Sequence, residues 1–194
     1  MNELTQLGLE VQAFCENNRW NFCVIGGLAV QHWGEPRFTK DLDITLLTGF
    51  GGEEAIVDKW LAHFESRISN AREFSLRHRV ILLRSSGGIG IDVALGALPF
   101  EEKAIARSKK IEIEAAAALR LCTAEDLIVM KAFASRPMDW NDVRGILVRQ
   151  GTRNLDWRHI RQYLKPLCDL KEAPEIMTQL ELLREEVRTG EPLK

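Results

Sequence analysis

The sequence predicts an α+β fold: a mixed β-sheet flanked by helices, followed by a C-terminal helical domain. Short apolar runs bounded by turn residues alternate with amphipathic segments up to about residue 120, and helical periodicity dominates from Thr123 onward. The chain has 194 residues, of which 45% are hydrophobic, enough to bury a core. We therefore expect two domains, residues 1–120 and residues 121–194.

Apolar residues at helical spacing predict an N-terminal helix that ends near Asn17 and an amphipathic helix over residues 53–69. A short helix is expected over residues 28–33, between a glycine pair and Gly34. The apolar faces of the two longer helices consist of Leu4, Leu7, Val11 and Phe14, and of Ile56, Trp60, Leu61 and Phe64.

Short apolar or alternating runs predict the strands. These runs cover residues 22–25, 41–46, 80–83, 89–95 and 111–114. A Ser-Ser-Gly-Gly turn joins the third run to the fourth, so we expect them to pair as a hairpin.

The second half of the chain shows helical patterns. Thr123 to Asp126 resembles a capping box ahead of an apolar helical segment. Further helices are expected around residues 139–150, 156–166 and 172–188.

Composition excludes several classes of protein. No run of about 18 apolar residues is present, and the first residues lack the pattern of a secretory signal peptide. The four cysteines are scattered without zinc-ligand spacing, so we expect reduced, buried thiols in a cytoplasmic protein that does not bind a membrane.

The net charge of −2 does not indicate a nucleic-acid-binding protein, but two segments are rich in arginine. Residues 66–84 hold five arginines against one glutamate, and residues 144–165 hold five arginines and one lysine against one aspartate. Such segments form solvated charged faces or, alternatively, contact phosphates.

The carboxylates Asp41 and Asp43 stand two residues apart in a predicted strand, so their side chains share one face. Like charges at that spacing repel each other, and a divalent cation removes the penalty. Oxygen ligands of this type suit Mg²⁺ or Mn²⁺. The alternative is an exposed strand face with no ligand.

A third carboxylate, Asp92, interrupts an otherwise apolar predicted strand, flanked on its own face by the small residues Gly90 and Ala94. A lone acid in such a strand is disfavoured unless it is paired or metal-bound. If this strand lies beside the strand of Asp41, three carboxylates converge and could hold two metals for phosphoryl transfer.

The pair Gly26-Gly27 lies between a predicted strand and a predicted helix. Without side chains, these residues let backbone N–H groups approach a phosphate at a helix N-terminus. The alternative is a tight turn.

Together these motifs resemble the DNA polymerase β-type nucleotidyltransferases, and within them the AbiEii-like toxins of bacterial toxin–antitoxin pairs. The resemblance covers about residues 22–150. It rests on three segments: Val24-Ile25-Gly26-Gly27, Arg37-x-Thr39-x-Asp41-Leu42-Asp43-Ile44, and the strand with Asp92. It implies a minimal nucleotidyltransferase core, with Asp41, Asp43 and Asp92 as catalytic and metal-binding residues.

The resemblance also implies nucleotide-binding roles for Gly26, Gly27, Arg37 and Thr39. The segment from Glu125 to Arg136 is similar to the family segment that supplies a lysine, which would make Lys131 a ligand of the triphosphate. The later Lys-Asp-x-x-Asp motif has Met138 in place of its lysine. The motif's Asp139 and Asp142 are therefore either functional or helix N-terminal acids that complement the dipole.

The resulting prediction is a metal-dependent nucleotidyltransferase. It would move a nucleoside monophosphate from a nucleoside triphosphate to tRNA, a protein or a small molecule such as an aminoglycoside. A cognate antitoxin is implied by the resemblance alone. One alternative is a non-catalytic nucleotide- or partner-binding module on the same fold. A phosphohydrolase that uses the same acids has less support, because the four histidines are dispersed and form no cluster.

Overall fold

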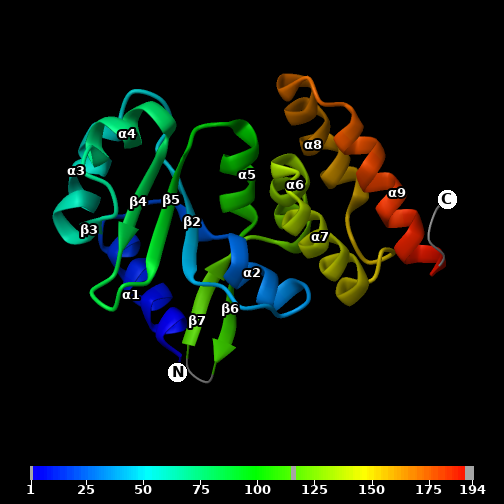
Figure 1. Cartoon of the computed structure of the whole chain (residues 1–194), viewed down its shortest axis with the longest axis horizontal. Helices are drawn as coiled ribbons and strands as arrows, with labels where there is room; N and C mark the ends of the chain where they lie inside the picture. The colour runs from blue at the N-terminus through cyan, green and yellow to red at the C-terminus, as the bar shows by residue number, and fades with distance from the viewer. Residues whose placement is uncertain (1, 115–116, 191–194) are drawn as a thin grey trace. The chain divides into compact units, whose positions relative to one another are not determined.

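The fold is described from a computed structural model, for residues 2–114 and 117–190 (Figure 1). Its contacts divide the chain into a sheet unit, Met1–Leu28 with Phe38–Cys122, and a helical unit, Ala29–Arg37 with Thr123–Lys194. The division falls inside the helix α2 (Gly26–Trp33). The predicted domain boundary at residue 120 stays a prediction.

The sheet unit contains a seven-stranded sheet, in the order β3-β4-β5-β2-β1-β7-β6 among the described residues. The strands β2 and β5 pair in parallel, as do β1 and β7, and the other pairs are antiparallel. The mixed sheet and its helices confirm the α+β prediction. The strands are β1 Phe22–Val24, β2 Asp41–Leu47, β3 Glu65–Ser66, β4 Val80–Arg84, β5 Gly90–Gly96, β6 Lys109–Glu114 and β7 Ala117–Leu121.

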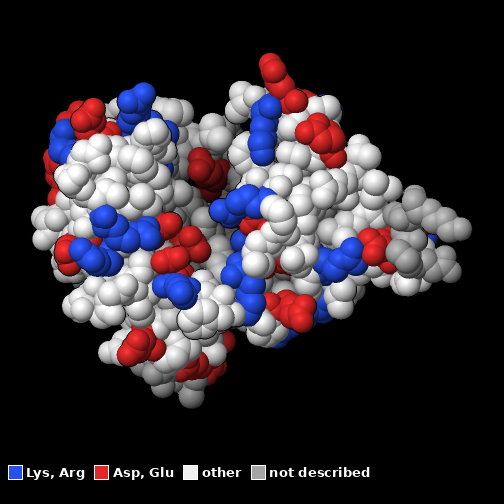
Figure 2. All heavy atoms as spheres, viewed as in Figure 1, with Lys and Arg blue, Asp and Glu red and all other residues white. Residues whose placement is uncertain are grey.

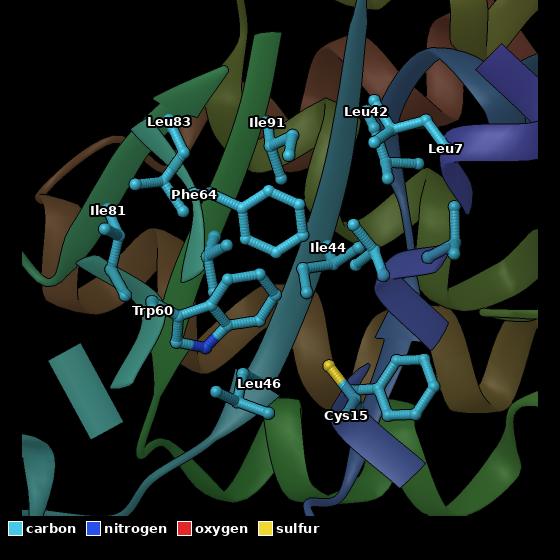
Figure 3. Packing of buried hydrophobic residues seen from close by; sticks show 14 of the residues in the cluster. Leu7, Cys15, Leu42, Ile44, Leu46, Trp60, Phe64, Ile81, Leu83 and Ile91 are labelled. Atoms are coloured by element: carbon cyan, nitrogen blue, oxygen red, sulfur yellow. The ribbon is translucent and has the colours of Figure 1, made fainter. Parts of the chain in front are cut away.

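The core of the sheet unit lies against one face of β2 (Figure 3). Leu42, Ile44 and Leu46 have no exposed surface and share one cluster with residues of the helices α1 (Glu3–Asn17) and α3 (Glu53–His63). Because side chains alternate along a strand, this core directs the odd-numbered residues of β2 to the opposite face. The helices α4 (Ala71–His78) and α5 (Pro99–Arg107) complete the unit.

The predicted helix over residues 53–69 is confirmed as far as His63 and wrong beyond it. The helix α3 ends at His63, and Phe64 is extended, with φ −118° and ψ 150°. The two residues after Phe64 pair with β4 as the edge strand β3. The side chain of Phe64 is buried in the core cluster, so packing of its aromatic ring favours an extended backbone at this residue over continuation of the helix.

The helical unit agrees with the predicted pattern to within a few residues. Its helices are α6 Ala124–Ala134, α7 Pro137–Gln150, α8 Trp157–Lys171 and α9 Glu175–Thr189. Thr123 caps α6 as expected, because its Oγ1 accepts a hydrogen bond from the Asp126 N–H at 3.3 Å.

Two composition-based expectations can be compared with the described residues. None of their helices has the length and hydropathy needed to cross a bilayer. All four cysteines are buried and free of disulfides.

We predict that Leu46→Ala lowers the free energy of unfolding by about 3 kcal/mol, because it leaves a cavity in the core of the sheet unit. Leu170→Ala on α8 is the matched control, since Leu170 is 73% exposed. Urea unfolding measures both changes. Equal losses in the two variants would contradict this description of the core.

Candidate functional site: three carboxylates on one sheet face

The three predicted acids lie on neighbouring strands of the sheet unit. In the parallel β2–β5 pair, Asp43 is directly opposite Asp92, and Asp41 is opposite Gly90. The strand adjacency that the prediction for Asp92 required is therefore present. Asp41 and Asp43 share a face, and Asp92 belongs to the same face as its partner in the register. Figure 2 shows acidic and basic side chains side by side over this part of the sheet.

The carboxylate of Asp43 lies directly against the backbone of Gly26 and Gly27. The Gly27 N–H donates to Oδ2 of Asp43 at 3.3 Å, and the Ile25 N–H donates to the backbone oxygen of Asp43 at 2.9 Å. Gly26 has φ +58°, and a Cβ there would lie 2.0 Å from Oδ2 and 2.6 Å from Cβ of Asp43. Only glycine fits this approach.

A second close approach joins Gly27 to Thr39. A Cβ on Gly27 would lie 2.4 Å from Oγ1 of Thr39, and that hydroxyl donates to the backbone oxygen of Asp41 at 3.3 Å. The structure thus places Gly26 and Gly27 against Asp43, and Thr39 against Gly27 and the backbone of Asp41. Their binding of phosphate stays a prediction.

A residue that the sequence did not single out lies among the carboxylates. The guanidinium of Arg67 forms an ion pair with Asp92, and its Nη1 is 3.8 Å from Oδ1 of Asp41. Arg67 follows β3, where its N–H donates to the backbone oxygen of Leu82 at 3.0 Å. The sequence offered one signal, the membership of Arg67 in an arginine-rich segment.

The surroundings of Asp92 shift the pKa of its carboxyl upward. Burial raises the pKa of the Asp92 carboxyl, the positive charge of Arg67 opposes that change, and the negative charge of Asp41 raises the pKa further. The net result is that the pKa of Asp92 is raised from the ordinary value of an aspartate.

The residues of this face are of the chemical type that suits a divalent cation. Three carboxylates on adjacent strands are the oxygen donors that Mg²⁺ takes in proteins. The carboxylates of Asp43 and Asp41 occupy the space that side chains at positions 26 and 90 would need, because a Cβ at either glycine would come within 2.1 Å of a carboxylate oxygen. As the side chains are placed, residues 2–114 and 117–190 hold no group of three potential ligands close enough for a metal.

The other predicted residues form a buried ionic network in the helical unit. Nζ of Lys131 is 3.0 Å from Asp139 and 2.8 Å from Asp142. Arg37 binds Asp142 with two nitrogens, at 2.7 and 2.9 Å, and Arg136 binds Asp139 at 2.6 Å. Lys131 and both aspartates are buried. The predicted contact of Lys131 and Arg37 with a triphosphate stays a prediction.

The network keeps both of its aspartates ionised. Burial by itself would raise the pKa of Asp139 and of Asp142. Hydrogen bonds from Arg136 and Lys131 to the first, and from Arg37 and Lys131 to the second, outweigh it and lower the pKa of each.

Much of the arginine-rich segment over residues 66–84 is neutralised by acidic neighbours. This pairing favours a solvated charged face over a surface for phosphates. Ion pairs link Arg72 to Glu54 and Asp58, Arg79 to Glu53, and Arg84 to Glu65.

We predict that Gly26→Ala is more destabilising than Gly49→Ala. Both glycines have positive φ, +58° and +68°, so both variants strain the backbone by about 1–2 kcal/mol. A Cβ on Gly49 meets nothing within 4 Å, whereas one on Gly26 overlaps the side chain of Asp43, including its Cβ. Urea unfolding compares the variants, and an equal loss would show that Asp43 does not constrain residue 26.

The buried network predicts a loss of stability in acid. A lowered pKa stabilises the fold above the ordinary aspartate pKa of about 3.9, and that stability is lost as pH falls through the lower, folded-state pKa. Asp142→Asn should cost about 3 kcal/mol at pH 7, because it removes one partner from buried charges. It should also weaken the pH dependence below about pH 4.

Urea unfolding at pH 7 and in acid checks this prediction. Asp169→Asn is the control, because Asp169 forms an exposed pair with Lys165. A loss at pH 7 no greater than that of the control would argue against the network.

Comparison with solved structures supports the fold. An antigenic nucleotidyltransferase-like protein from Paracoccidioides brasiliensis aligns with a TM-score of 0.54 and 16% identity, over 92% of this chain and 92% of that chain. The solution structure of the antibiotic-resistance factor ANT(2″)-Ia aligns with a TM-score of 0.45 and 16% identity, over 96% of this chain and 91% of that one. ANT(2″)-Ia in complex with adenylyl-2″-tobramycin gives the same two values over 97% and 99%.

The likeness to the fungal protein concerns the fold, and the two lower TM-scores support no conclusion about this chain. No curated protein matches the sequence. A family model does match it, over residues 2–184. The chain therefore belongs to the family described as nucleotidyltransferase of unknown function (DUF6036).

Proposed function

We propose that the protein transfers a nucleoside monophosphate from a nucleoside triphosphate to an acceptor hydroxyl, with release of pyrophosphate. One observation carries the proposal: Asp43 and Asp92 face each other across a parallel strand pair, with Asp41 two residues earlier on the same face. The description of the family as nucleotidyltransferases supports it.

In this proposal Asp41, Asp43 and Asp92 hold Mg²⁺ or Mn²⁺. When bound, such a cation neutralises phosphate charge and polarises the phosphorus–oxygen bonds. Asp92 takes the proton of the acceptor hydroxyl, whose oxygen then bonds to the α-phosphorus while the bond to pyrophosphate breaks. The backbone N–H groups at the start of α2, around Gly26 and Gly27, bind phosphate oxygens, and Thr39 supports this turn.

We further propose that Lys131 and Arg37 balance negative charge on the pyrophosphate leaving group. Both already bind carboxylates of this network, Arg37 that of Asp142 and Lys131 those of Asp139 and Asp142. Asp139 and Asp142 then act as positioning residues that fix the lysine and the arginine.

The acceptor is proposed from three classes: the 3′ end of tRNA, a partner protein, or a small molecule such as an aminoglycoside. The ion pairs in the segment over residues 66–84 weaken one of the two arginine-rich segments as support for an RNA acceptor. An AbiEii-like toxin with a cognate antitoxin is the biological role that the sequence resemblance suggests. Four buried cysteines outside any disulfide support a cytoplasmic location for such a protein.

A second candidate is a nucleotide- or partner-binding module without catalysis. The placement of Arg67 between Asp41 and Asp92 favours it, because an arginine there opposes a metal at the same oxygens. Calorimetry with ATP, Mg²⁺ and a chelator separates the candidates. ATP binding without transfer to any acceptor, with or without Mg²⁺, would favour the binding module.

The transfer proposal is tested with each triphosphate labelled at its α-phosphate, incubated with the protein and with total bacterial RNA and protein. We expect a labelled product whose nature identifies the nucleotide and the acceptor class. Asp43→Ala should lower the transfer rate at least about a hundredfold, since it removes a charged group from the site of phosphoryl transfer.

The matched control is Asp58→Ala, because Asp58 lies on α3 in an exposed pair with Arg72. It should transfer at the wild-type rate. Wild-type activity in Asp43→Ala would rule out the proposed mechanism.

A further inference from the structure

The guanidinium of Arg67 spans two of the three carboxylates. It pairs with Oδ1 of Asp92 through Nη2, and its Nη1 lies 3.8 Å from Oδ1 of Asp41. The two aspartates come from different strands, so one side chain ties the face of β2 to the face of β5. A planar guanidinium suits this task, because its nitrogens form a fork.

The structure leaves space for this contact. A Cβ on Gly90 would lie 2.1 Å from Oδ1 of Asp41 and 3.0 Å from Nη1 of Arg67, so a larger residue there would push the two groups aside. The backbone of Arg67 is fixed by its hydrogen bond to the Leu82 oxygen, on β4. The backbone hydrogen bond thus holds Arg67 beside the sheet, and the absence of a side chain at Gly90 lets its guanidinium reach the carboxylates.

The contact of Arg67 with Asp41 and Asp92 affects how strongly these carboxylates bind another cation. Carboxylates this close repel each other, and a cation between them lowers the free energy of the folded state. A divalent cation held by Asp41 and Asp92 would use the same oxygens that face Arg67, and two cations at those oxygens repel each other. Binding of one therefore opposes binding of the other.

We propose that Arg67 is an internal counter-cation that competes with the divalent metal for Asp41 and Asp92. This inference rests on the proposed function, which assigns those two residues to the metal. Its consequence is that free metal binds weakly, and that the metal enters efficiently only together with the triphosphate, whose own charge contributes to the binding. Arg67 is then a positioning residue that keeps the carboxylates together before substrate arrives.

The test measures binding of Mn²⁺ alone, without nucleotide, by electron paramagnetic resonance. We expect Arg67→Ala and Arg67→Gln to bind Mn²⁺ about three- to tenfold more tightly than the wild type, because a partly exposed pair contributes modestly. The control is Arg84→Ala, which removes the exposed pair of Arg84 with Glu65 from the same sheet but touches none of the three aspartates. Its affinity for Mn²⁺ should equal that of the wild type.

Thermal unfolding gives a second readout that does not depend on activity. Without metal, Arg67→Gln should melt below the wild type, since the carboxylates lose their counter-ion. Added Mg²⁺ should then raise its melting temperature more than that of the wild type or of Arg84→Ala. An equal rise in all three proteins would overturn the inference.

The outcomes also separate this inference from the proposed function. If the wild type binds the metal with triphosphate and transfers nucleotide, but Arg67→Ala gains no affinity for Mn²⁺ alone, the inference fails and the function stands. If neither protein binds Mn²⁺ with or without triphosphate, the metal site itself is wrong, and both fail.

Discussion

The parallel pairing of β2 with β5 determines where the carboxylates and the core residues of the sheet unit lie. It aligns Asp43 with Asp92 and keeps Asp41 on the same face, while the alternate residues of β2 enter a core without exposed surface. Repulsion among the carboxylates opposes this arrangement, and burial of the apolar side chains favours it. The neighbouring features reduce the repulsion: the Gly27 N–H donates to Asp43, and Arg67 pairs with Asp92.

The helical unit handles its charges differently. Lys131, Asp139 and Asp142 are buried, and each carboxylate receives hydrogen bonds from two cationic side chains. Full pairing makes such a network tolerable in a low-dielectric environment, whereas loss of one member leaves a buried charge without compensation.

Local pattern was enough to predict the strands β2 and β5, because period-two alternation directly encodes which side chains share a face. It could not predict that the two strands are neighbours, since pairing depends on contacts between distant segments. Arg67 escaped notice for the same reason: its partners are 26 and 25 residues away in sequence, at Asp41 and Asp92.

Other misses have a local cause. The helix α4 has too few regularly spaced apolar residues to be predicted, and β7 consists of alanine, leucine and arginine, which also favour helices. The end of α3 depended on the burial of Phe64, which a helical pattern does not reveal. Lys131 was found by resemblance, but its two carboxylate partners became apparent only from the packing of α6 and α7.

The close approach of Gly26 and Asp43 couples these two positions energetically. A Cβ at residue 26 would overlap side-chain atoms of Asp43, and a glycine at position 43 would lack those atoms. The effects of substitutions at the two positions are therefore not additive, and part of the cost of enlarging one is removed by shrinking the other. Any sequence that keeps the carboxylate at position 43 in this backbone is committed to glycine at position 26, so a feature of the chemistry restricts the conformation of a turn 17 residues earlier.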